Sequence, residues 1–217
     1  FSREKNFFGG HGIVGAQVPI GCGLAFSHKY RDEANVCLTY LGDGAVNQGQ
    51  VYESFNMAAL WDLPVLFVIE NNQYGMGTAV TRAAAGRSLA ERGAAYGIPG
   101  RQVDGMDVLA VRKAGAEALE HCRTGKGPYI LEMKTYRYRG HSMSDPAKYR
   151  TREEVDAMRK QHDPIDQLRE VLHKQNVTED RLKDIDADVK AIVLRATEFA
   201  QTSPEPDPSE LFTDILI

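Results

Sequence analysis

The fold of this chain is decided by residues 36–77, which read VCLTYLGDGAVNQGQVYESFNMAALWDLPVLFVIENNQYGMG. The first seven residues of the stretch are mostly apolar, with β-branched and aromatic side chains among them, and they end abruptly at Asp43-Gly44. This pattern is typical of a buried strand that runs into a tight turn.

A helix and a second strand follow in the same stretch. Apolar side chains recur every four residues from Val51 to Ala59, which predicts one face of a helix over about residues 48–61. Pro64 ends that helix, and the continuous apolar run at residues 65–70 has the length of a strand. The stretch therefore predicts a strand–helix–strand unit.

Polar residues follow both predicted strands. Asp43 comes after the first strand and Asn72 after the second, 29 positions later. A crossover helix makes such strands parallel, so their carboxyl ends lie at one edge of the sheet, with neighbouring strands about 4.8 Å apart. A carboxylate and an amide oxygen suit Mg²⁺ or Ca²⁺ better than zinc, and Mg²⁺ completes its shell with water and ligand phosphates. We therefore expect a site for a metal-bound diphosphate, although either pair alone is also ordinary turn chemistry.

The same residues carry a resemblance. Gly42-Asp43-Gly44, then 26 residues, then Asn71-Asn72 resembles the thiamine diphosphate signature. The flanking GDGAVNQGQVYESFNMAALWDLP and ENNQYGMGT resemble the alpha subunits of the decarboxylating component of pyruvate dehydrogenase, and this similarity extends over essentially the whole chain. The resemblance implies an α/β fold with a doubly wound, mostly parallel sheet and a helical C-terminal extension. It also implies thiamine diphosphate and Mg²⁺ as cofactors.

The resemblance implies roles for single residues of this stretch. Asp43, Asn72 and the backbone carbonyl of Tyr74 would ligate Mg²⁺. Gly44 and Ala45 would approach the diphosphate.

A glycine-rich segment precedes the central stretch. Residues 7–15 read FFGGHGIVG and contain a literal G-x-G-x-x-G, but the polar residues before them lack the strand that a dinucleotide fingerprint requires. We expect a loop followed by a helix over about residues 16–30. By resemblance, Gly12 and Val14 would meet the aminopyrimidine ring of thiamine through backbone groups and an apolar contact. The alternative is a loop that packs only against its own helix.

The chain beyond the central stretch continues the α/β pattern. Residues 78–100 suggest loop and short helix, and residues 101–104 a short strand. Asp107 can cap a helix that runs to about residue 123. Residues 129–135 predict another parallel strand, whose carboxyl end should reach the same edge of the sheet as Asp43.

Residues 136–150, YRYRGHSMSDPAKYR, follow that last strand. Their arginines, glycine and serines suggest a mobile loop that closes on an anionic ligand. His141 is the best general acid or base candidate of the chain. In the family that the chain resembles, this His lies by the cofactor diphosphate in a loop that orders when thiamine diphosphate binds. The alternative is an exposed His in a flexible loop.

Ser142 matches the inhibitory phosphorylation site of regulated family members, and a phosphate there would repel the cofactor diphosphate. The chain departs from the regulated pattern, because Lys148 precedes Tyr149 where such members have a second serine, and Gly86 stands where a third would be. An unmodified Ser142 is therefore the favoured interpretation.

The composition becomes helical and charged after residue 150, so we divide the chain into a diphosphate- and metal-binding α/β domain, residues 1–150, and a helical extension, residues 151–217. Thr151 with Glu154 forms a capping box. Asp163-Pro164 begins a further helix to about residue 175.

A long helix is expected over about residues 179–200. Leu182, Ile185, Val189 and Ile192 form an apolar stripe on it, which we interpret as a face packed on the main domain, with a partner surface as the alternative. The tail from residue 203 is broken by prolines and ends in apolar residues, which suggests docking on another subunit.

Composition limits the classes of function. The net charge is −4 over 217 residues and there is no basic run, so nucleic acid is not an expected partner. The chain has no apolar stretch near the roughly 18 residues of a membrane span and no visible signal peptide. The three cysteines (Cys22, Cys37 and Cys122) suggest a reducing compartment and core positions. A start without Met and about four strand candidates suggest a fragment or processed chain.

Thiamine chemistry also needs a carboxylate on the aminopyrimidine, and no glutamate here lies in a matching motif. The chain therefore resembles the diphosphate-binding half of a shared site. The resemblance implies a beta subunit, an α2β2 heterotetramer and a lipoyl-bearing acyltransferase core, in the cytoplasm of a bacterium or the mitochondrial matrix of a eukaryote. We predict oxidative decarboxylation of pyruvate with acetyl transfer to a lipoyl group. The alternatives are the alpha subunit of a branched-chain 2-oxoacid or acetoin dehydrogenase, and a non-catalytic nucleotide-binding module.

Overall fold

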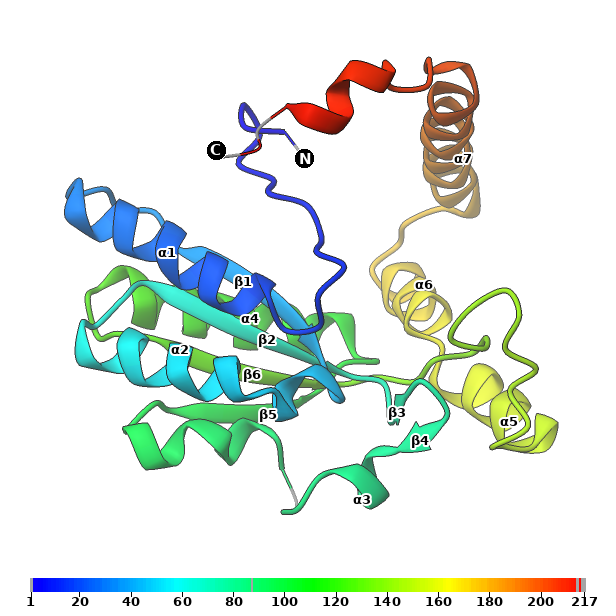
Figure 1. Ribbon diagram of the computed structural model, residues 1–217. Coiled ribbons are helices and arrows are strands. Elements are labelled where there is room, and N and C mark those ends of the chain that lie inside the picture. Colours follow the sequence, from blue (N-terminus) through cyan, green and yellow to red (C-terminus); the bar gives the residue numbers. More distant parts are fainter. Residues whose placement is uncertain (1, 87, 214, 216–217) are drawn as a thin grey trace. The chain divides into compact units, whose positions relative to one another are not determined.

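A computed structural model describes residues 2–86, 88–213 and 215 (Figure 1). The chain divides into two compact units, residues 1–167 and 168–217. The sequence-based boundary after residue 150 stays a prediction.

The elements of the first unit alternate between helices and strands. The strands are β1 (Cys37–Gly42), β2 (Val65–Asn71), β3 (Tyr74–Gly75), β4 (Thr78–Ala79), β5 (Gly100–Asp104) and β6 (Tyr129–Lys134). The helices of the chain are α1 (Gln17–Tyr30), α2 (Gly49–Leu60), α3 (Val80–Ala83), α4 (Val108–Arg123), α5 (Arg152–His162), α6 (Pro164–Lys174) and α7 (Glu179–Thr202). Three-residue to seven-residue 3₁₀ helices are η1 (Ala45–Asn47), η2 (Ala90–Tyr96) and η3 (Pro208–Phe212).

The predicted strand–helix–strand unit is confirmed. β1 and β2 are parallel neighbours, with Cys37 opposite Val65 and Gly42 opposite Glu70. The crossover helix α2 buries Phe55 completely, and its ring meets that of Phe67 on β2 edge to face, with 4.8 Å between centroids. Burial of one such side chain contributes roughly 1.5–3 kcal/mol. The apolar face predicted from the sequence is therefore part of the core.

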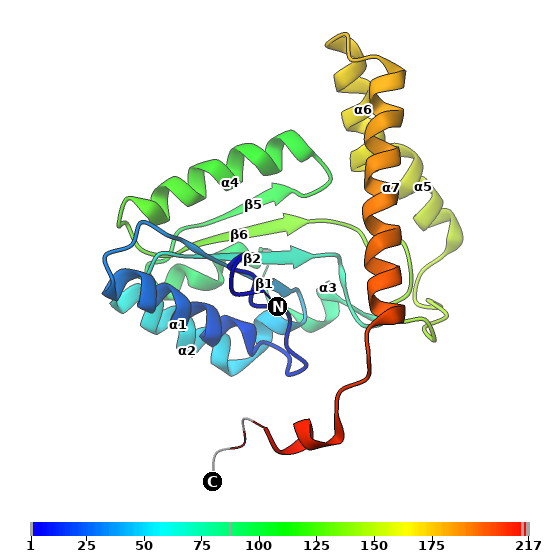
Figure 2. The same ribbon diagram turned by 90° about the horizontal axis from the view of Figure 1, so that it is seen from above.

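The main sheet has the order β1-β2-β6-β5, and all of its pairs are parallel. Successive side chains on a strand point to opposite faces, and each face of the sheet has its own apolar core. One core joins residues of α1 and α2 to the sheet, and the other joins residues of α4. Figure 2 shows α1 and α2 on one side of the sheet and α4 on the other. The α/β fold with a mostly parallel sheet is therefore confirmed.

The local signals between the strands are also confirmed. The Asp107 carboxylate accepts hydrogen bonds from the backbone amides of Leu109 and Ala110, so it caps α4. Gly125, with φ of 77°, closes the other end of the helix. β5 and β6 appear at the predicted strands, and Cys22, Cys37 and Cys122 are buried free thiols. Within the described residues, no helix is long and apolar enough to cross a membrane.

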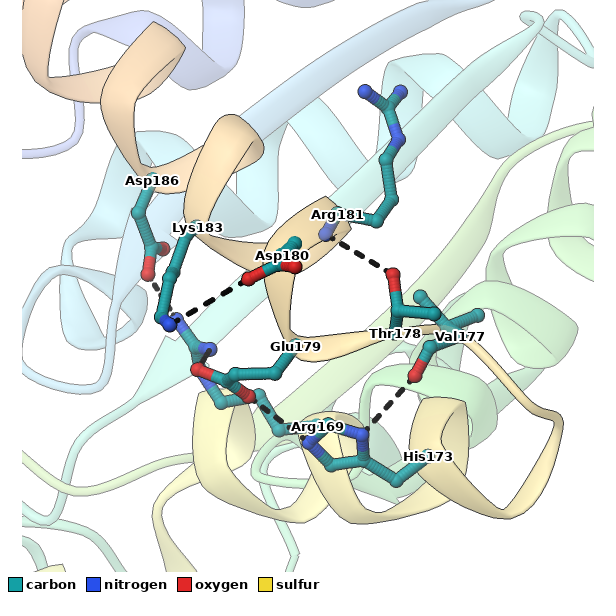
Figure 3. Close-up of polar contacts among 9 residues, drawn as sticks. All are labelled: Arg169, His173, Val177, Thr178, Glu179, Asp180, Arg181, Lys183 and Asp186. Carbon is teal, nitrogen blue, oxygen red and sulfur yellow. Dashed lines mark hydrogen bonds and ion pairs between the residues drawn. The ribbon is translucent and has the colours of Figure 1, made fainter.

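Polar contacts join α6 to the start of α7 in the second unit (Figure 3). Arg169 forms an ion pair with Asp186, and His173 Nε2 lies 3.3 Å from a Glu179 carboxylate oxygen. Thr178 caps α7 by accepting from the Arg181 amide at 3.3 Å. The helix bounds agree with the prediction to within two residues.

The packing of the apolar stripe of α7 on the main domain stays a prediction, because the stripe and the main domain lie in different units. Leu182 is buried, but Ile185, Val189 and Ile192 are 42%, 53% and 56% exposed. The tail residues Leu211 and Phe212 are also exposed, and the end of the predicted apolar tail lies partly outside the described residues. The periodicity predicted the helix correctly, whereas the burial of its face depends on neighbours that a periodic pattern does not specify.

Candidate functional site

The carboxyl ends of the four parallel strands lie at one edge of the main sheet (Figure 1). Asp43 follows β1, Asn72 follows β2, and the loop that contains His141 follows β6. This edge is the usual ligand-binding edge of an open α/β sheet. The topology therefore places all three segments where the sequence predicted them.

The turns after β1 and β2 approach each other through glycine. A Cβ atom on Gly75 would lie 3.4 Å from Cα of Gly44 and 3.9 Å from Oδ2 of Asp43. These are ordinary van der Waals distances, so the two turns are in contact through their backbones at these glycines. The Asp43 turn and the Asn72–Tyr74 turn thus converge, as their positions on neighbouring strands required.

Asp43 is 3% exposed. Burial raises the pKa of its carboxyl above the ordinary value, while hydrogen bonds from the backbone amides of Asp43 and Asn72 and the charge of Arg137 act in the opposite direction. A buried carboxylate that is incompletely compensated is costly for the protein. A divalent cation at this position would remove that cost, which is a physical reason to expect one.

The other two proposed metal ligands have partners within the chain. The Asn72 side-chain oxygen accepts from the Tyr74 backbone amide at 3.2 Å. The Tyr74 carbonyl accepts from Nη1 of Arg137, also at 3.2 Å. All three groups offer hard oxygens, so the donor set fits Mg²⁺. The structure brings the three residues into one neighbourhood, and their ligation of an ion remains a prediction.

The glycine-rich loop lies against the start of α2. Gln50 Nε2 donates to the Val14 carbonyl at 3.0 Å, and a Cβ on Gly15 would lie 3.3 Å from the side chain of Gln48. Gly12 and Val14 are exposed. Among residues 2–16 the only β structure is an isolated bridge between Ser2 and Phe7, so the G-x-G-x-x-G has no strand before it.

Arg137 links the loop after β6 to the turn after β2. Besides Tyr74, its guanidinium donates to the Met76 carbonyl and to the Tyr149 hydroxyl, the latter at 2.7 Å. The Tyr149 hydroxyl in turn donates to Asp145 at 2.9 Å. A planar guanidinium suits several acceptors at once, so one side chain joins two segments that are 61 or more residues apart.

Arg150 adds aromatic contacts to the same junction. Its guanidinium carbon lies 5.8 Å from the Tyr74 ring centroid, 5.2 Å from that of Tyr136 and 5.7 Å from that of Tyr149. Tyr136 also donates to Glu154 at 2.6 Å, and burial together with that carboxylate raises the pKa of Tyr136 to about 12. The Glu154 carboxylate therefore binds a tyrosine, while its backbone amide donates to the Thr151 hydroxyl.

His141 and Ser142 are exposed. The loop around them is shaped by Asp145, whose carboxylate accepts from the His141 amide at 2.7 Å and from the Ala147 amide at 2.8 Å. These hydrogen bonds lower the pKa of Asp145. The Ser142 and Ser144 hydroxyl oxygens are 3.1 Å apart. The backbone of His141 is thus fixed by Asp145, while its imidazole ring is accessible from solvent.

A cavity of about 540 Å³ opens near the ends of β5 and β6. Its lining includes Gln73, Asp104, Lys134, Tyr136 and His162. Polar groups therefore line the sheet edge beyond the two turns as well.

Sequence reasoning missed Glu132, a buried carboxylate within β6. It binds Asn71, the residue before the predicted metal ligand Asn72, with 2.8 Å between Nδ2 and Oε1. The available signal was one acidic residue inside the apolar run YILEMK. A buried charge in a central strand needs partners, and that rule could have singled it out.

The whole chain is similar to known proteins. The family model described as "Dehydrogenase E1 component" matches residues 1–209. The chain is 64% identical over 218 residues to the pyruvate dehydrogenase E1 component subunit alpha of Rhizobium meliloti (strain 1021), covering 100% of this chain and 63% of the relative. It is 58% identical over 217 residues to the protein of the same description from Zymomonas mobilis subsp. mobilis, covering 100% of this chain and 61% of the relative.

A eukaryotic relative is similar over nearly the same region. The testis-specific mitochondrial pyruvate dehydrogenase E1 component subunit alpha of Rattus norvegicus is 54% identical over 209 residues, which is 95% of this chain and 53% of that protein. The chain thus spans less than two thirds of the length of these relatives.

Proposed function

This chain belongs to the dehydrogenase E1 component family, and from that membership we propose that it forms the diphosphate-binding half of a thiamine diphosphate- and Mg²⁺-dependent 2-oxoacid dehydrogenase. The single observation that supports this most is the close approach of Gly75 to Gly44, which joins the Asp43 turn to the Asn72–Tyr74 turn. Two oxygen-bearing turns that meet at the ligand edge of a parallel sheet suit a metal-bound diphosphate.

Three groups of the chain would hold the ion: the Asp43 carboxylate, the Asn72 side-chain oxygen and the Tyr74 carbonyl. Gly44 and Ala45 would allow the diphosphate to approach the backbone at the start of η1. Thiamine diphosphate, when bound, supplies a carbon nucleophile and an electron sink for decarboxylation. Because Asn72 and Tyr74 now satisfy partners within the chain, metal binding would require Arg137 to release or share the Tyr74 carbonyl.

The loop after β6 would cover the site. Its arginines favour an anionic ligand, and the exposed imidazole of His141 would hold a proton against an oxygen of the diphosphate. Gly12 and Val14 would contact the aminopyrimidine ring from the start of α2, where Gln50 already fixes the Val14 carbonyl. Ser142 is accessible to a kinase, and a phosphate on it would add negative charge next to a diphosphate. We retain the unmodified serine as the working interpretation.

The site would be completed by a second chain. No glutamate of this chain lies in a pyrimidine-binding motif, so a beta subunit would supply the activating carboxylate in an α2β2 heterotetramer. A lipoyl-bearing acyltransferase core would accept the acetyl group. The subunit-alpha relatives support such a partner. We expect a location in the bacterial cytoplasm or, in a eukaryote, in the mitochondrial matrix.

Calorimetry tests cofactor binding directly. We would titrate thiamine diphosphate into the full-length protein with its beta partner, with and without Mg²⁺, and then titrate NAD. Binding that requires Mg²⁺ is the expected result. Tight binding of NAD without a metal-dependent thiamine diphosphate signal would instead favour the nucleotide-binding module.

Pyruvate is the proposed substrate because the similar relatives are described as pyruvate dehydrogenase subunits. Steady-state rates with pyruvate and with 3-methyl-2-oxobutanoate separate this proposal from a branched-chain enzyme. We expect the larger kcat/KM with pyruvate, and a preference for the branched substrate would contradict the substrate assignment. Acetoin serves as a third substrate in the same assay.

A further inference from the structure

Glu132 is an acidic residue buried in the central sheet. It lies in the middle of β6 and is 1% exposed. On this strand it shares a face with Ile130, which belongs to the core under α1 and α2. Its register partners are Ile69 on β2 and Gln102 on β5. Because it is covered on all sides, Glu132 cannot touch a substrate, and its role must act through its neighbours.

The Glu132 carboxylate accepts five hydrogen bonds. Oε1 accepts from Asn71 Nδ2 at 2.8 Å. Oε2 accepts from four donors: the Ser88 hydroxyl at 2.7 Å, the Leu89 amide at 2.8 Å, the Gln102 side chain at 3.0 Å and the Ala90 amide at 3.1 Å. Burial raises the pKa of Glu132, but these hydrogen bonds lower it below its ordinary value overall. Four of the five donors are N–H groups that cannot accept, so the carboxylate serves as an acceptor.

The contact with Asn71 connects Glu132 to the turn after β2. The Asn71 amide has two ends: Nδ2 donates to Glu132, and Oδ1 accepts from the Gln73 backbone amide at 3.1 Å. Glu132 therefore decides which end of the Asn71 amide faces the turn, since an acceptor-only carboxylate can bind only the NH₂ end.

That turn needs such support. Gln73 has φ of 77°, a left-handed conformation that is unfavourable for a residue with a Cβ. The residues on either side of it are Asn72 and Tyr74, and the Asn72 side-chain oxygen faces the Tyr74 amide. The conformation of Gln73 thus sets the relative placement of the two oxygens proposed to hold Mg²⁺.

We propose that Glu132 is a positioning residue for the metal site: through Asn71, it holds the turn that presents Asn72 and Tyr74 to the ion. This inference rests on the metal-dependent cofactor binding proposed above. Apolar residues at a buried position of this kind are often as stabilising as a buried charge, or more so, so stability alone does not explain the carboxylate.

The first test is Glu132→Gln in the full-length protein with its beta partner. The new NH₂ group would face the Asn71 NH₂, and if Asn71 flipped, its NH₂ would face the Gln73 amide instead. In either arrangement two N–H donors face each other with no acceptor between them. We expect the Kd for Mg²⁺, measured calorimetrically at saturating thiamine diphosphate, to rise about 10- to 100-fold, as for other residues that support metal ligands.

A swapped pair separates this role from general stabilisation. In Glu132→Gln with Asn71→Asp, the Gln NH₂ can donate to one Asp oxygen while the other still accepts from the Gln73 amide. We expect the double variant to recover Mg²⁺ affinity to within about 3-fold of the parent protein, because complementary donors and acceptors are restored. Failure of both variants to differ from the parent would overturn the proposal.

Leu131→Ala is the matched control. Leu131 is the adjacent residue of β6, 1% exposed, with its side chain on the opposite face of the sheet. We expect this variant to melt at a lower temperature with unchanged Mg²⁺ affinity. A loss of Mg²⁺ affinity equal to that of Glu132→Gln would mean that the metal site responds to any weakening of the sheet, and it would also overturn the proposal.

Amide hydrogen exchange of the metal-free protein provides a readout without cofactor. Glu132→Gln should speed exchange of the Gln73 amide about 10-fold or more and leave the amide of Phe67, in the middle of β2, unchanged. Should Glu132→Gln fail to fold, Asn71→Ala breaks the same connection, and unchanged Gln73 exchange in that variant would count against the proposal. Absence of Mg²⁺-dependent binding in the parent protein would refute the proposed function instead, while the exchange experiment would still test the positioning role.

Discussion

Two regions at the same sheet edge are held in different ways. The turns after β1 and β2 meet backbone to backbone, with Gly44 against Gly75 and the buried carboxylate of Asp43 nearby. The loop after β6 is held by side chains, chiefly by Arg137 donating across to Tyr74 and Met76. The first arrangement depends on backbone packing, whereas the second depends on long side chains at a partly exposed surface.

The two arrangements suit different tasks, metal binding for the turns and ligand admission for the loop. A metal site requires oxygens at fixed distances, which close backbone packing supplies. A loop that admits and covers a ligand must be able to open, and segments with few buried apolar contacts open at low cost in free energy. We therefore expect changes in the turns to abolish binding, and changes in the loop to weaken turnover or loop order.

The largest effect is expected for Asp43→Asn. This change removes the negative charge from the proposed metal site and keeps the shape of the side chain. The Kd for thiamine diphosphate in the presence of Mg²⁺ should rise by more than about 100-fold, the upper end for residues that only support ligands. Asp62→Asn, at an exposed aspartate just after α2, is the control and should bind normally. Calorimetry measures both, and unchanged affinity in Asp43→Asn would mean that the ion lies elsewhere.

His141→Ala should separate the loop from the turns. An exposed imidazole contributes little to stability, so the melting temperature should stay within about 1 °C of the parent, while kcat falls about 100-fold, typical of a lost general acid or base. Affinity for thiamine diphosphate should change far less than in Asp43→Asn. His28→Ala, on α1 and paired with Glu33, should retain full kcat. A fully active His141→Ala variant would restore the interpretation of a bystander in a flexible loop.

Arg137→Lys tests the connection between the two regions. Lysine keeps the charge but cannot donate to Tyr74, Met76 and Tyr149 from one planar group. We expect an approximately 10-fold loss of kcat/KM and faster proteolytic cleavage within residues 136–150. The same substitution at Arg139, an exposed residue of the same loop, should have neither effect. Equal behaviour of the two variants would show that the loop does not depend on this guanidinium.

The smallest effect is a pH dependence of loop order. Hydrogen bonds from the His141 and Ala147 amides lower the pKa of Asp145 below its ordinary 3.8. A lowered pKa in the folded protein means that the carboxylate stabilises the loop above pH 3.8 and loses this effect as the pH falls through the lowered value. Exchange of the His141 amide, corrected for intrinsic rates, should therefore become faster only below pH 3.8. In Asp145→Asn the same amide should exchange fast at every pH. A wild-type loop that loosens at neutral pH would contradict this account.

Much of the first region could be predicted from the sequence, because its signals are local. The alternation of apolar runs with a four-residue period gave β1, α2 and β2, and parallel pairing then brought Asp43 near Asn72. Asp107 and Thr151 predicted the starts of their helices, because both are residue types that favour the N-cap. These inferences depended on residues close in sequence and on one general rule of topology.

The second region could not be predicted in the same way. The contacts of Arg137 with Tyr74 and Met76 join residues 61 or more positions apart, and no periodic pattern encodes them. Glu132 was missed because sequence patterns reveal an acidic residue in a strand but not the donors that gather around it. The stripe on α7 shows the same limit, because its period predicts a helix with an apolar face but not what covers Ile185, Val189 and Ile192. In each case the missing information was which distant segment lies alongside.

The claim that the rest depends on is that the two glycine-linked turns share one divalent ion. A crystal structure of the protein with the proposed beta subunit, Mg²⁺ and thiamine diphosphate measures this directly. We predict one ion about 2.0–2.1 Å from oxygens of Asp43, Asn72 and the Tyr74 carbonyl, with diphosphate oxygens completing its shell. An ion that binds the diphosphate without contact to Asp43 and Asn72 would contradict the account.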